Sequence, residues 1–406
     1  MKDFFKKHGD KALFVLALAF LAAAFFRMEG WRPAQTPGIV FTQWWEGDLG
    51  KDTLRLLVEE FEELHGIKVT IEYRAYEDLR RDLFALAEIP PPSNGNFVAN
   101  TNFIGDVIAL DPLWTTELLK MDIIEEDVTL LSFINVLYYN VEILKEAGFS
   151  RPPKNRSEFI DYAKVLAGGR GSSPGFMLGI ALNENNTRGV YDDIFPWIWA
   201  TGVPLIRDGN PVVNSRQVVE SLSFLAALNN EGLIAPSMFL ADSAWKLEDF
   251  ISGRVACMVA PTLYIDQVRE RMGDDAFGIT SVPGPDNYFG RPFFATAGWA
   301  FGVHSASERK EEARLFADFL AGKASLLSDK IGAAPGNGAP NLFGTPARDP
   351  FYSKVWDITI SGEAARDFTD IPWIALQSVF REELASLFAG RKTPTEAATA
   401  IQERWE

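Results

Sequence analysis

Two pairs of acidic residues in this sequence stand beside aromatic residues, and paired carboxylates of this kind have two uses. The pairs are Glu46 with Asp48, after two tryptophans, and Asp192 with Asp193, after a tyrosine. Two carboxyl groups on either side of a glycosidic bond can hydrolyse it, whereas a carboxylate can also accept hydrogen bonds from sugar hydroxyls without any reaction. Because the distance between the carboxyl groups decides between these uses, catalysis, binding and a hydrated surface stay open, and we favour binding.

Other patterns typical of enzymes are weak. Residues 171–175 (GSSPG) match the GxSxG pattern of a serine nucleophile, which needs a strand before the serine and a helix after it. Here the preceding residues end a predicted helix, and His304 is the only histidine further along the chain. The sequence has no HExxH, P-loop or GxGxxG pattern. We therefore interpret residues 168–175 as a linker and predict a protein that is not an enzyme and uses no cofactor or metal.

The composition of the 406 residues also favours binding. Thirty-nine basic and 55 acidic residues give a formal net charge of −16, which argues against a nucleic-acid partner. The single cysteine, Cys257, excludes an intrachain disulfide and a CxxC redox pair, and three histidines leave little material for histidine-based catalysis. Aromatic residues are plentiful, with 11 Trp, 31 Phe and 9 Tyr.

The N-terminus predicts export. Four lysines and two aspartates among residues 1–11 give this segment a net charge of +2, and residues 12–26 are an uninterrupted apolar run. The run suits the core of a signal peptide and is shorter than the ~20 residues of a typical membrane-spanning helix. Residues 1–26 are therefore a cleaved signal peptide or an uncleaved membrane anchor, and residues 27–38 a linker. The predicted location is periplasmic or extracellular, with tethering to the inner membrane through residues 12–26 if they are retained.

The elements that must position these residues alternate between strand and helix. Apolar residues at helical spacing predict a helix over 52–64, between short strands at 39–42 and 67–73, with a second helix over 77–87. This order is the start of a parallel α/β sheet. Further strands are predicted at 107–110, 131–139, 177–182, 256–259, 278–282 and 298–303, and further helices at 114–119, 141–147, 157–167, 193–201, 218–229, 247–252, 308–320, 374–389 and 393–405.

Several segments together resemble the extracellular solute-binding proteins of family 1, the maltose-binding-protein-like receptors of ABC importers. The most specific is LYYNVEILKEAGFSRPPKNRSEFIDYAKVLA (137–167), in which a short helix ending in AG is followed by two prolines and a second helix. Two departures are Gly105, where the family usually has Pro, and Asn155-Arg156, where it has Thr-Trp. Other matching segments are IVFTQWWEGD (39–48), HGIKVTIEYRAYEDLRRDLFALAE (65–88), FISGRVACMVAP (250–261) and AGRKTPTEAATAIQERW (389–405).

The resemblance implies an α/β, two-lobed periplasmic-binding-protein fold, also called a Venus flytrap, with a mainly parallel sheet in each lobe. By the matching segments, the N-terminal lobe holds residues 37–131 and 300–348, and the C-terminal lobe holds residues 135–296 and 349–406. Hinge crossovers fall near 132–134, 297–299 and 349. The resemblance also implies a monomer that closes on a small solute by hinge motion and docks on a membrane permease.

The loops that follow the strands are the candidates for the ligand site, because ligands of open α/β sheets lie beyond the carboxyl ends of the strands. Aromatic rings suit the apolar faces of a sugar and carboxylates suit its hydroxyls, so we expect a mono- or oligosaccharide. Trp197 and Trp199 are also candidates for the core, because Ile194, Phe195 and Ile198 surround them in sequence. The predicted ligand-binding residues are Trp44, Trp45, Glu46, Asp48, Tyr76, Asp111, Trp114, Tyr191, Asp192, Trp197, Tyr264, Trp299 and Trp373.

Three alternatives stay open. The acidic and aromatic residues would also suit a cationic solute such as a polyamine. An uncleaved anchor would be consistent with a membrane-tethered sensory protein. An exported glycoside hydrolase using the carboxylate pairs is the third.

Overall fold

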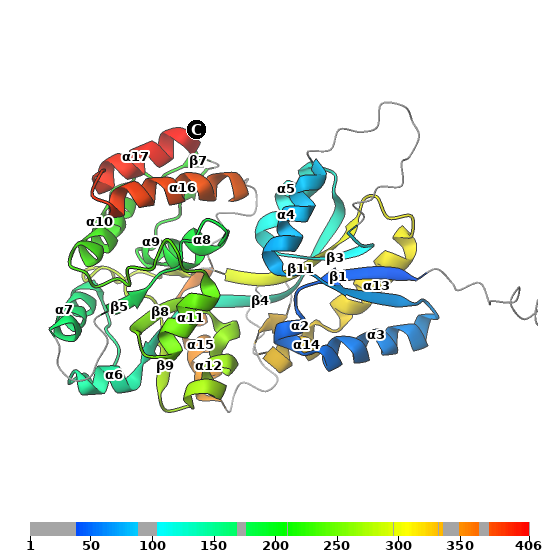
Figure 1. Cartoon of the computed structure of the whole chain (residues 1–406), viewed down its shortest axis with the longest axis horizontal. Coiled ribbons are helices and arrows are strands. Elements are labelled where there is room, and N and C mark those ends of the chain that lie inside the picture. Colours follow the sequence, from blue (N-terminus) through cyan, green and yellow to red (C-terminus); the bar gives the residue numbers. More distant parts are fainter. Residues whose placement is uncertain are drawn as a thin grey trace, which may run out of the picture.

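The computed structural model describes residues 38–87, 104–168, 176–208, 210–294, 296–331, 333–335, 349–364 and 373–405. The predicted signal peptide or anchor, most of the linker after it and the GxSxG segment lie outside these residues. The described chain forms two lobes joined by long strands (Figure 1), which confirms the predicted α/β, two-lobed fold class. None of the described helices combines the length and the apolar character that crossing a membrane requires.

The N-terminal lobe is built on the predicted strand–helix–strand–helix order. Strand β1 (Ile39–Gln43) lies between β2 (Val69–Tyr73) and β3 (Val107–Leu110) and is parallel to both. The connecting helices include α3 (Lys51–His65) and α4 (Tyr76–Ala87). The other elements of this lobe are α2 (Glu46–Leu49), α5 (Pro112–Lys120), α13 (Lys310–Gly322), α14 (Ala324–Ile331) and β12 (Ala334–Pro335).

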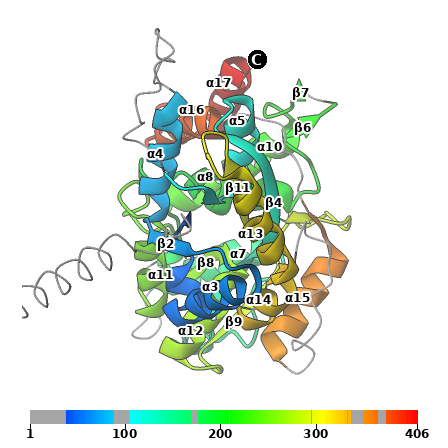
Figure 2. The same cartoon turned by 90° about the vertical axis from the view of Figure 1, so that its right-hand side faces the viewer.

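Alternation along β3 explains why helices cover both faces of this sheet. Val107 and Ala109 pack into one apolar cluster with α3 and α13, while Ile108 and Leu110 pack into another with α4 and α5. Both views place α3, α13 and α14 together, away from α4 (Figures 1 and 2). The carboxyl ends of β1 and β3 therefore emerge between two packed layers, where the loops after them are held in place.

Two long antiparallel strands connect the lobes, β4 (Ile124–Asn140) and β11 (Thr296–His304). Residues 124–134 of β4 pair with β11, and residues 135–140 pair with β8 (Val255–Pro261) and β9 (Phe277–Thr280). β4 thus changes sheet beside the crossover predicted at 132–134. The boundaries of the two lobes stay a prediction.

The C-terminal lobe continues from β8, which is parallel to β5 (Phe176–Gly179). Its helices are α6 (Val141–Glu146), α7 (Arg156–Ala167), α8 (Gly189–Asp193), α9 (Phe195–Trp199), α10 (Arg216–Asn230), α11 (Ser243–Ile251), η1 (Thr262–Tyr264), α12 (Ile265–Met272), α15 (Pro350–Ser361), α16 (Trp373–Phe388) and α17 (Pro394–Trp405). Its short strands are β6 (Ile206–Arg207), β7 (Asn210–Pro211), β10 (Phe293–Phe294) and β13 (Glu363–Ala364).

The structure refines several predicted elements. The predicted helix at 193–201 is two short helices, α8 and α9, separated at Ile194, and Pro196 lies in the first turn of α9. Between β1 and α3 the structure adds the short helix α2, which the sequence analysis does not predict. A capping box opens α17: the N–H of Glu396 donates to the Thr393 hydroxyl at 3.2 Å, and the N–H of Thr393 donates to the Glu396 carboxylate at 2.8 Å.

Candidate ligand-binding site

A pocket of about 660 Å³ lies where the lobes meet, a volume typical of small-molecule sites. Its walls come from the loops after β1 and β3, from the start of α4, from the segment before α8 and from the start of α11, and β4 and β11 contribute Phe133, Gly298 and Trp299. Of the thirteen predicted ligand-binding residues, seven line it: Trp44, Asp48, Tyr76, Asp111, Asp192, Tyr264 and Trp299.

Trp44 and Tyr76 form the aromatic wall of the N-terminal lobe. Their ring centroids lie 5.2 Å apart with the planes nearly perpendicular, at 88°. Trp114 of α5 is buried behind them, with ring centroids 5.5 Å from Trp44 and 4.7 Å from Tyr76. The buried indole packs against both rings of the wall and so helps to set their positions.

Tyr264 and Trp299 supply aromatic surface from the other lobe and from the connecting strand. Trp299 stacks on Trp45, with ring centroids 5.2 Å apart and planes 13° apart. Trp45 itself is fully buried and does not line the pocket. One of the two adjacent tryptophans after β1 therefore faces the pocket, and the other supports Trp299 from behind.

Six predicted residues lie outside the pocket lining: Trp45, Glu46, Trp114, Tyr191, Trp197 and Trp373. Glu46 pairs with Lys51 at 3.0 Å on the surface of the N-terminal lobe. Trp197 is buried against Phe159 and Phe224, with ring centroids 5.2 and 5.3 Å away. Tyr191 and Trp373 are buried against each other, at a centroid distance of 5.7 Å. These positions match the ordinary place of large aromatic residues in the core.

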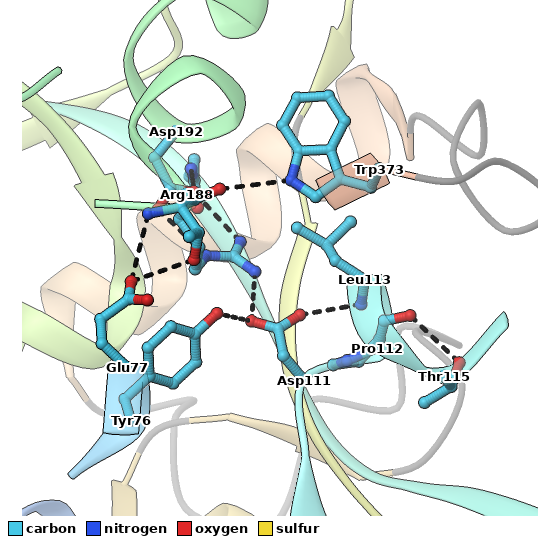
Figure 3. Close-up of polar contacts among 11 residues, drawn as sticks. Tyr76, Glu77, Asp111, Pro112, Leu113, Thr115, Arg188, Asp192 and Trp373 are labelled. Carbon is cyan, nitrogen blue, oxygen red and sulfur yellow. Dashed lines mark hydrogen bonds and ion pairs between the residues drawn. The ribbon is translucent and has the colours of Figure 1, made fainter. Parts of the chain in front are cut away.

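Arg188 connects two carboxylates of the pocket, and the sequence analysis did not select it. Its guanidinium donates to Asp111 at 2.6 Å and to the two oxygens of Asp192 at 3.1 Å each, as Figure 3 shows. Asp111 also accepts from the Tyr76 hydroxyl at 2.7 Å and from the N–H of Leu113, where it caps α5. The sequence did offer a signal for Arg188, because it lies in the loop after β5. The rule that ligands lie beyond the carboxyl ends of strands had already selected the loops after β1 and β3.

The segment before Arg188 brings further polar groups to the pocket wall. Asn183, Asn185 and Asn186 line it together with Asp242 and Glu77. Gly189 allows this segment to pack closely, because a Cβ atom there would overlap the carbonyl oxygen of Ala181. The sequence analysis selected none of these three asparagines, so they are pocket-lining residues that it missed.

Asp48 differs from the other carboxylates of the pocket. No hydrogen bond or ion pair to its carboxylate is found among the described residues, although Asp111 and Asp192 both have such partners. The Asp48 side chain can be reached by water from the pocket. The surrounding pocket walls nevertheless displace part of its hydration shell, and this desolvation raises its pKa to about 6. A solute in the pocket would therefore meet a carboxylate with free acceptor capacity.

Each predicted carboxylate pair is divided by the fold. Asp48 and Asp192 line the pocket, while Glu46 lies outside its lining and Asp193 is buried in an ion pair with Lys246 at 2.6 Å. Neither pair thus presents two carboxyl groups to one solute. Among the described residues, no group of three or more His, Cys, Asp or Glu side chains is arranged to hold a metal ion.

Comparison with known proteins places this architecture in a family. A curated relative from Deinococcus radiodurans, named "Probable ABC transporter-binding protein", is 24% identical over 271 residues, which cover 62% of this chain and 63% of the relative. The match thus spans less than two thirds of that relative's length.

Two solved structures share the fold. The GacH receptor of Streptomyces glaucescens, studied unliganded and with acarbose, has a TM-score of 0.70 at 17% identity and covers 91% of this chain and 97% of its own. The cyclic α-maltosyl-1,6-maltose binding protein of Arthrobacter globiformis has a TM-score of 0.69 at 15% identity, with the same coverage. The sequence profile described as "Bacterial extracellular solute-binding protein" matches residues 47–325, so the chain belongs to the bacterial extracellular solute-binding protein family.

Proposed function

We propose that this chain is the exported solute receptor of an ABC importer and that it binds a carbohydrate between its lobes. The observation that carries the proposal is one pocket of about 660 Å³ in which Trp44, Tyr76 and Trp299 face carboxylates and amides from both lobes. Hinge closure of the lobes around the solute follows from the fold, since a ligand that contacts both lobes favours the closed state. A membrane permease is the partner that such a receptor serves.

A sugar matches this lining group by group. Its C–H faces are flat and apolar and suit the rings, whose quadrupoles favour contact with polarised hydrogens. Its hydroxyls both donate and accept, so they can bind the acceptor oxygens of Asp48 and the amides of Asn183 and Asn185. The two solved structures of this fold named above were described with, or named for, acarbose and a cyclic maltosyl saccharide, which supports the same ligand class.

The charge of the pocket argues against anionic sugars. Five carboxylates and one guanidinium line it, and the guanidinium of Arg188 is already shared between Asp111 and Asp192. A sugar phosphate or uronic acid would therefore enter a field of its own sign, and the described lining residues offer it no cation that is not already paired.

A cationic solute is the second candidate, because Asp48 has no partner among the described residues and lies in the same pocket as Trp44 and Tyr264. A protonated amine could pair with the carboxylate and lie against an aromatic face. A polyamine or an amino sugar is the form that such a solute would take.

The test is a thermal-shift screen of the purified protein against neutral sugars, amino sugars, uronic acids and polyamines. We expect a raised melting temperature with at least one neutral mono- or oligosaccharide and none with uronic acids. A shift with polyamines alone would replace the carbohydrate by the cationic alternative. Turnover of aryl glycosides, measured in parallel, would instead support the hydrolase.

A further inference from the structure

Two polar connections join the lobes beside the solute pocket. The first is the ion pair of Arg188, before α8, with Asp111, after β3. The second is made by the neighbouring Thr187, whose N–H and hydroxyl donate to the same oxygen of Glu77 on α4 at 3.1 and 3.0 Å. Figure 3 shows Arg188 linked to Asp111, with Glu77 close by. We call these four residues the interlobe clasp.

The ion pairs of Arg188 are largely buried. The side chains of Arg188, Asp111 and Asp192 are 12%, 4% and 6% exposed. Each buried carboxylate needs the guanidinium, since leaving either unpaired in such a place is costly. The planar fork of arginine is what allows one side chain to satisfy carboxylates on two lobes at once.

Residues of the clasp, and the neighbouring Asp192, have further hydrogen-bond partners. Tyr76 donates to Asp111, and the amide nitrogen of Asn135, on the connecting strand β4, donates to Asp192 at 2.8 Å. The carbonyl oxygen of Thr187 accepts from the indole N–H of Trp373 at 3.3 Å. Rotamers fixed by second partners lose little further entropy when the two lobes meet, so the contact is preorganised.

All of these contacts are made between groups of the chain itself, so none of them needs a bound solute. We propose that Arg188 is the positioning residue of the pocket: by tying Asp111 of one lobe to Asp192 of the other, it stabilises the closed arrangement, in which the lobes meet at these residues, and fixes the spacing of the pocket walls. The proposal concerns the empty receptor and stands whichever solute the pocket takes.

The effect on affinity follows from the populations of the two states. A ligand that binds only the closed state has an apparent dissociation constant equal to the intrinsic one divided by the closed fraction. If the clasp keeps most molecules closed, losing it weakens binding in proportion to the closed fraction lost. Because Arg188 and Asp111 also line the pocket, a loss of affinity alone does not separate a positioning role from direct contact, and the distance between the lobes measured without solute does.

The test measures the distance between the lobes without solute. Ala85 on α4 and Gln267 on α12 are exposed, and the natural Cys257 is fully buried, so cysteines introduced at these two positions can carry spin labels in the full chain. Arg188→Met is compared with the parent and with Arg216→Met, which removes an exposed arginine paired with Glu220 within α10. We expect a longer, broader distance distribution for Arg188→Met and none of this change for the control.

Asp111→Asn provides a second variant that keeps the cap of α5, because asparagine caps helices as well as aspartate does. It should lengthen the interlobe distance as Arg188→Met does, and the double variant should add little to either. Arg188→Lys should restore the closed distance only in part, because an ammonium cannot span both carboxylates as the fork does. In each variant, affinity for a solute found in the screen should fall about tenfold or more, together with the closed fraction.

Unchanged distance distributions in Arg188→Met and Asp111→Asn, with circular dichroism showing folded protein, would overturn the proposal. Additive effects of the two substitutions would overturn it equally, since they would show independent contacts. Because these distances are recorded without solute, failure of the sugar screen leaves this test intact.

Discussion

The indole rings of Trp45 and Trp299 stack almost parallel, with centroids 5.2 Å apart, although one ring follows strand β1 and the other belongs to strand β11. Trp45 is fully buried and Trp299 is 3% exposed, with its accessible surface on the pocket wall. The position of a pocket ring is thus set by a core ring of the N-terminal lobe.

Substitution of Trp45 tests this support. Trp45→Ala should lower the free energy of unfolding by ~3–5 kcal/mol, because it removes a large buried side chain and leaves a cavity beneath Trp299. Trp45→Phe should cost less, since it keeps apolar contact with Phe41. Both should be measured by denaturant unfolding, and wild-type stability of Trp45→Ala would show that this stack is not part of the core.

Substitution of the pocket tryptophans should weaken solute binding, and for Trp299, which is only 3% exposed, it should also lower the free energy of unfolding. For Trp44→Ala or Trp299→Ala, loss of a stacked sugar face should cost ~1–2 kcal/mol, or about 5–30-fold in the dissociation constant. Trp245→Ala is the matched control, because Trp245 is an exposed tryptophan outside this pocket. Titration calorimetry measures all three, and equal affinities would remove these rings from the site.

Much of the fold was predictable because its information is local. The helix α3 repeats apolar residues on one face, β1 and β3 are short, largely buried runs, and β2 alternates between apolar and polar residues. The rule that ligands lie beyond strand ends then selected Trp44, Asp48 and Asp111, which do line the pocket.

What the sequence could not supply is the tertiary partner of each side chain. Arg188 stands in a polar run that resembles any turn, and its importance depends on Asp111, 77 residues earlier. Trp44 and Trp45 are adjacent in sequence, yet one lines the pocket and the other is core, because neighbours along a chain can face opposite sides. Trp197 could be either, and packing against Phe159 and Phe224 decided it.

The pKa of Asp48 makes binding depend on pH. With this pKa raised to about 6 in the empty protein, the carboxylate is charged above pH 6 and protonated below. A cationic solute should therefore bind more weakly as the pH falls through 6, whereas a neutral sugar should lose less, since a protonated carboxyl still forms hydrogen bonds. Asp48→Asn should flatten either profile.

The raised pKa of Asp48 should also make the stability of the protein depend on pH: a lower pH weakens binding of a cation but favours folding. A carboxyl group whose pKa is higher folded than unfolded binds protons more tightly when folded, so its contribution favours folding as the pH falls from 6 towards the ordinary aspartate value. The effect should be small, because Asp48 is exposed. Calorimetric melting of the protein and of Asp48→Asn between pH 4 and pH 7 measures it, and identical pH dependences would contradict the shift.

We predict that Asp193 stabilises the fold and does not contact the solute. Its partner Lys246 is buried and also donates to the carbonyl of Val259 at 2.7 Å. Lys246→Met should therefore destabilise the protein by ~3–5 kcal/mol by leaving a buried carboxylate unpaired, and Asp193→Asn combined with Lys246→Met should recover part of this loss. Denaturant unfolding measures the free energies of unfolding of the parent, the single variant and the double variant. A Lys246→Met variant as stable as the parent would contradict the prediction.

The most direct test of the central claim is titration calorimetry of the purified protein with the solute that gives the largest thermal shift, repeated with Trp44→Ala/Trp299→Ala. The account predicts one site per chain for a neutral mono- or oligosaccharide, with affinity reduced in the double variant and unchanged in Trp245→Ala. Binding of sugar with equal affinity in all three proteins, or binding of polyamines with no sugar bound, would contradict it.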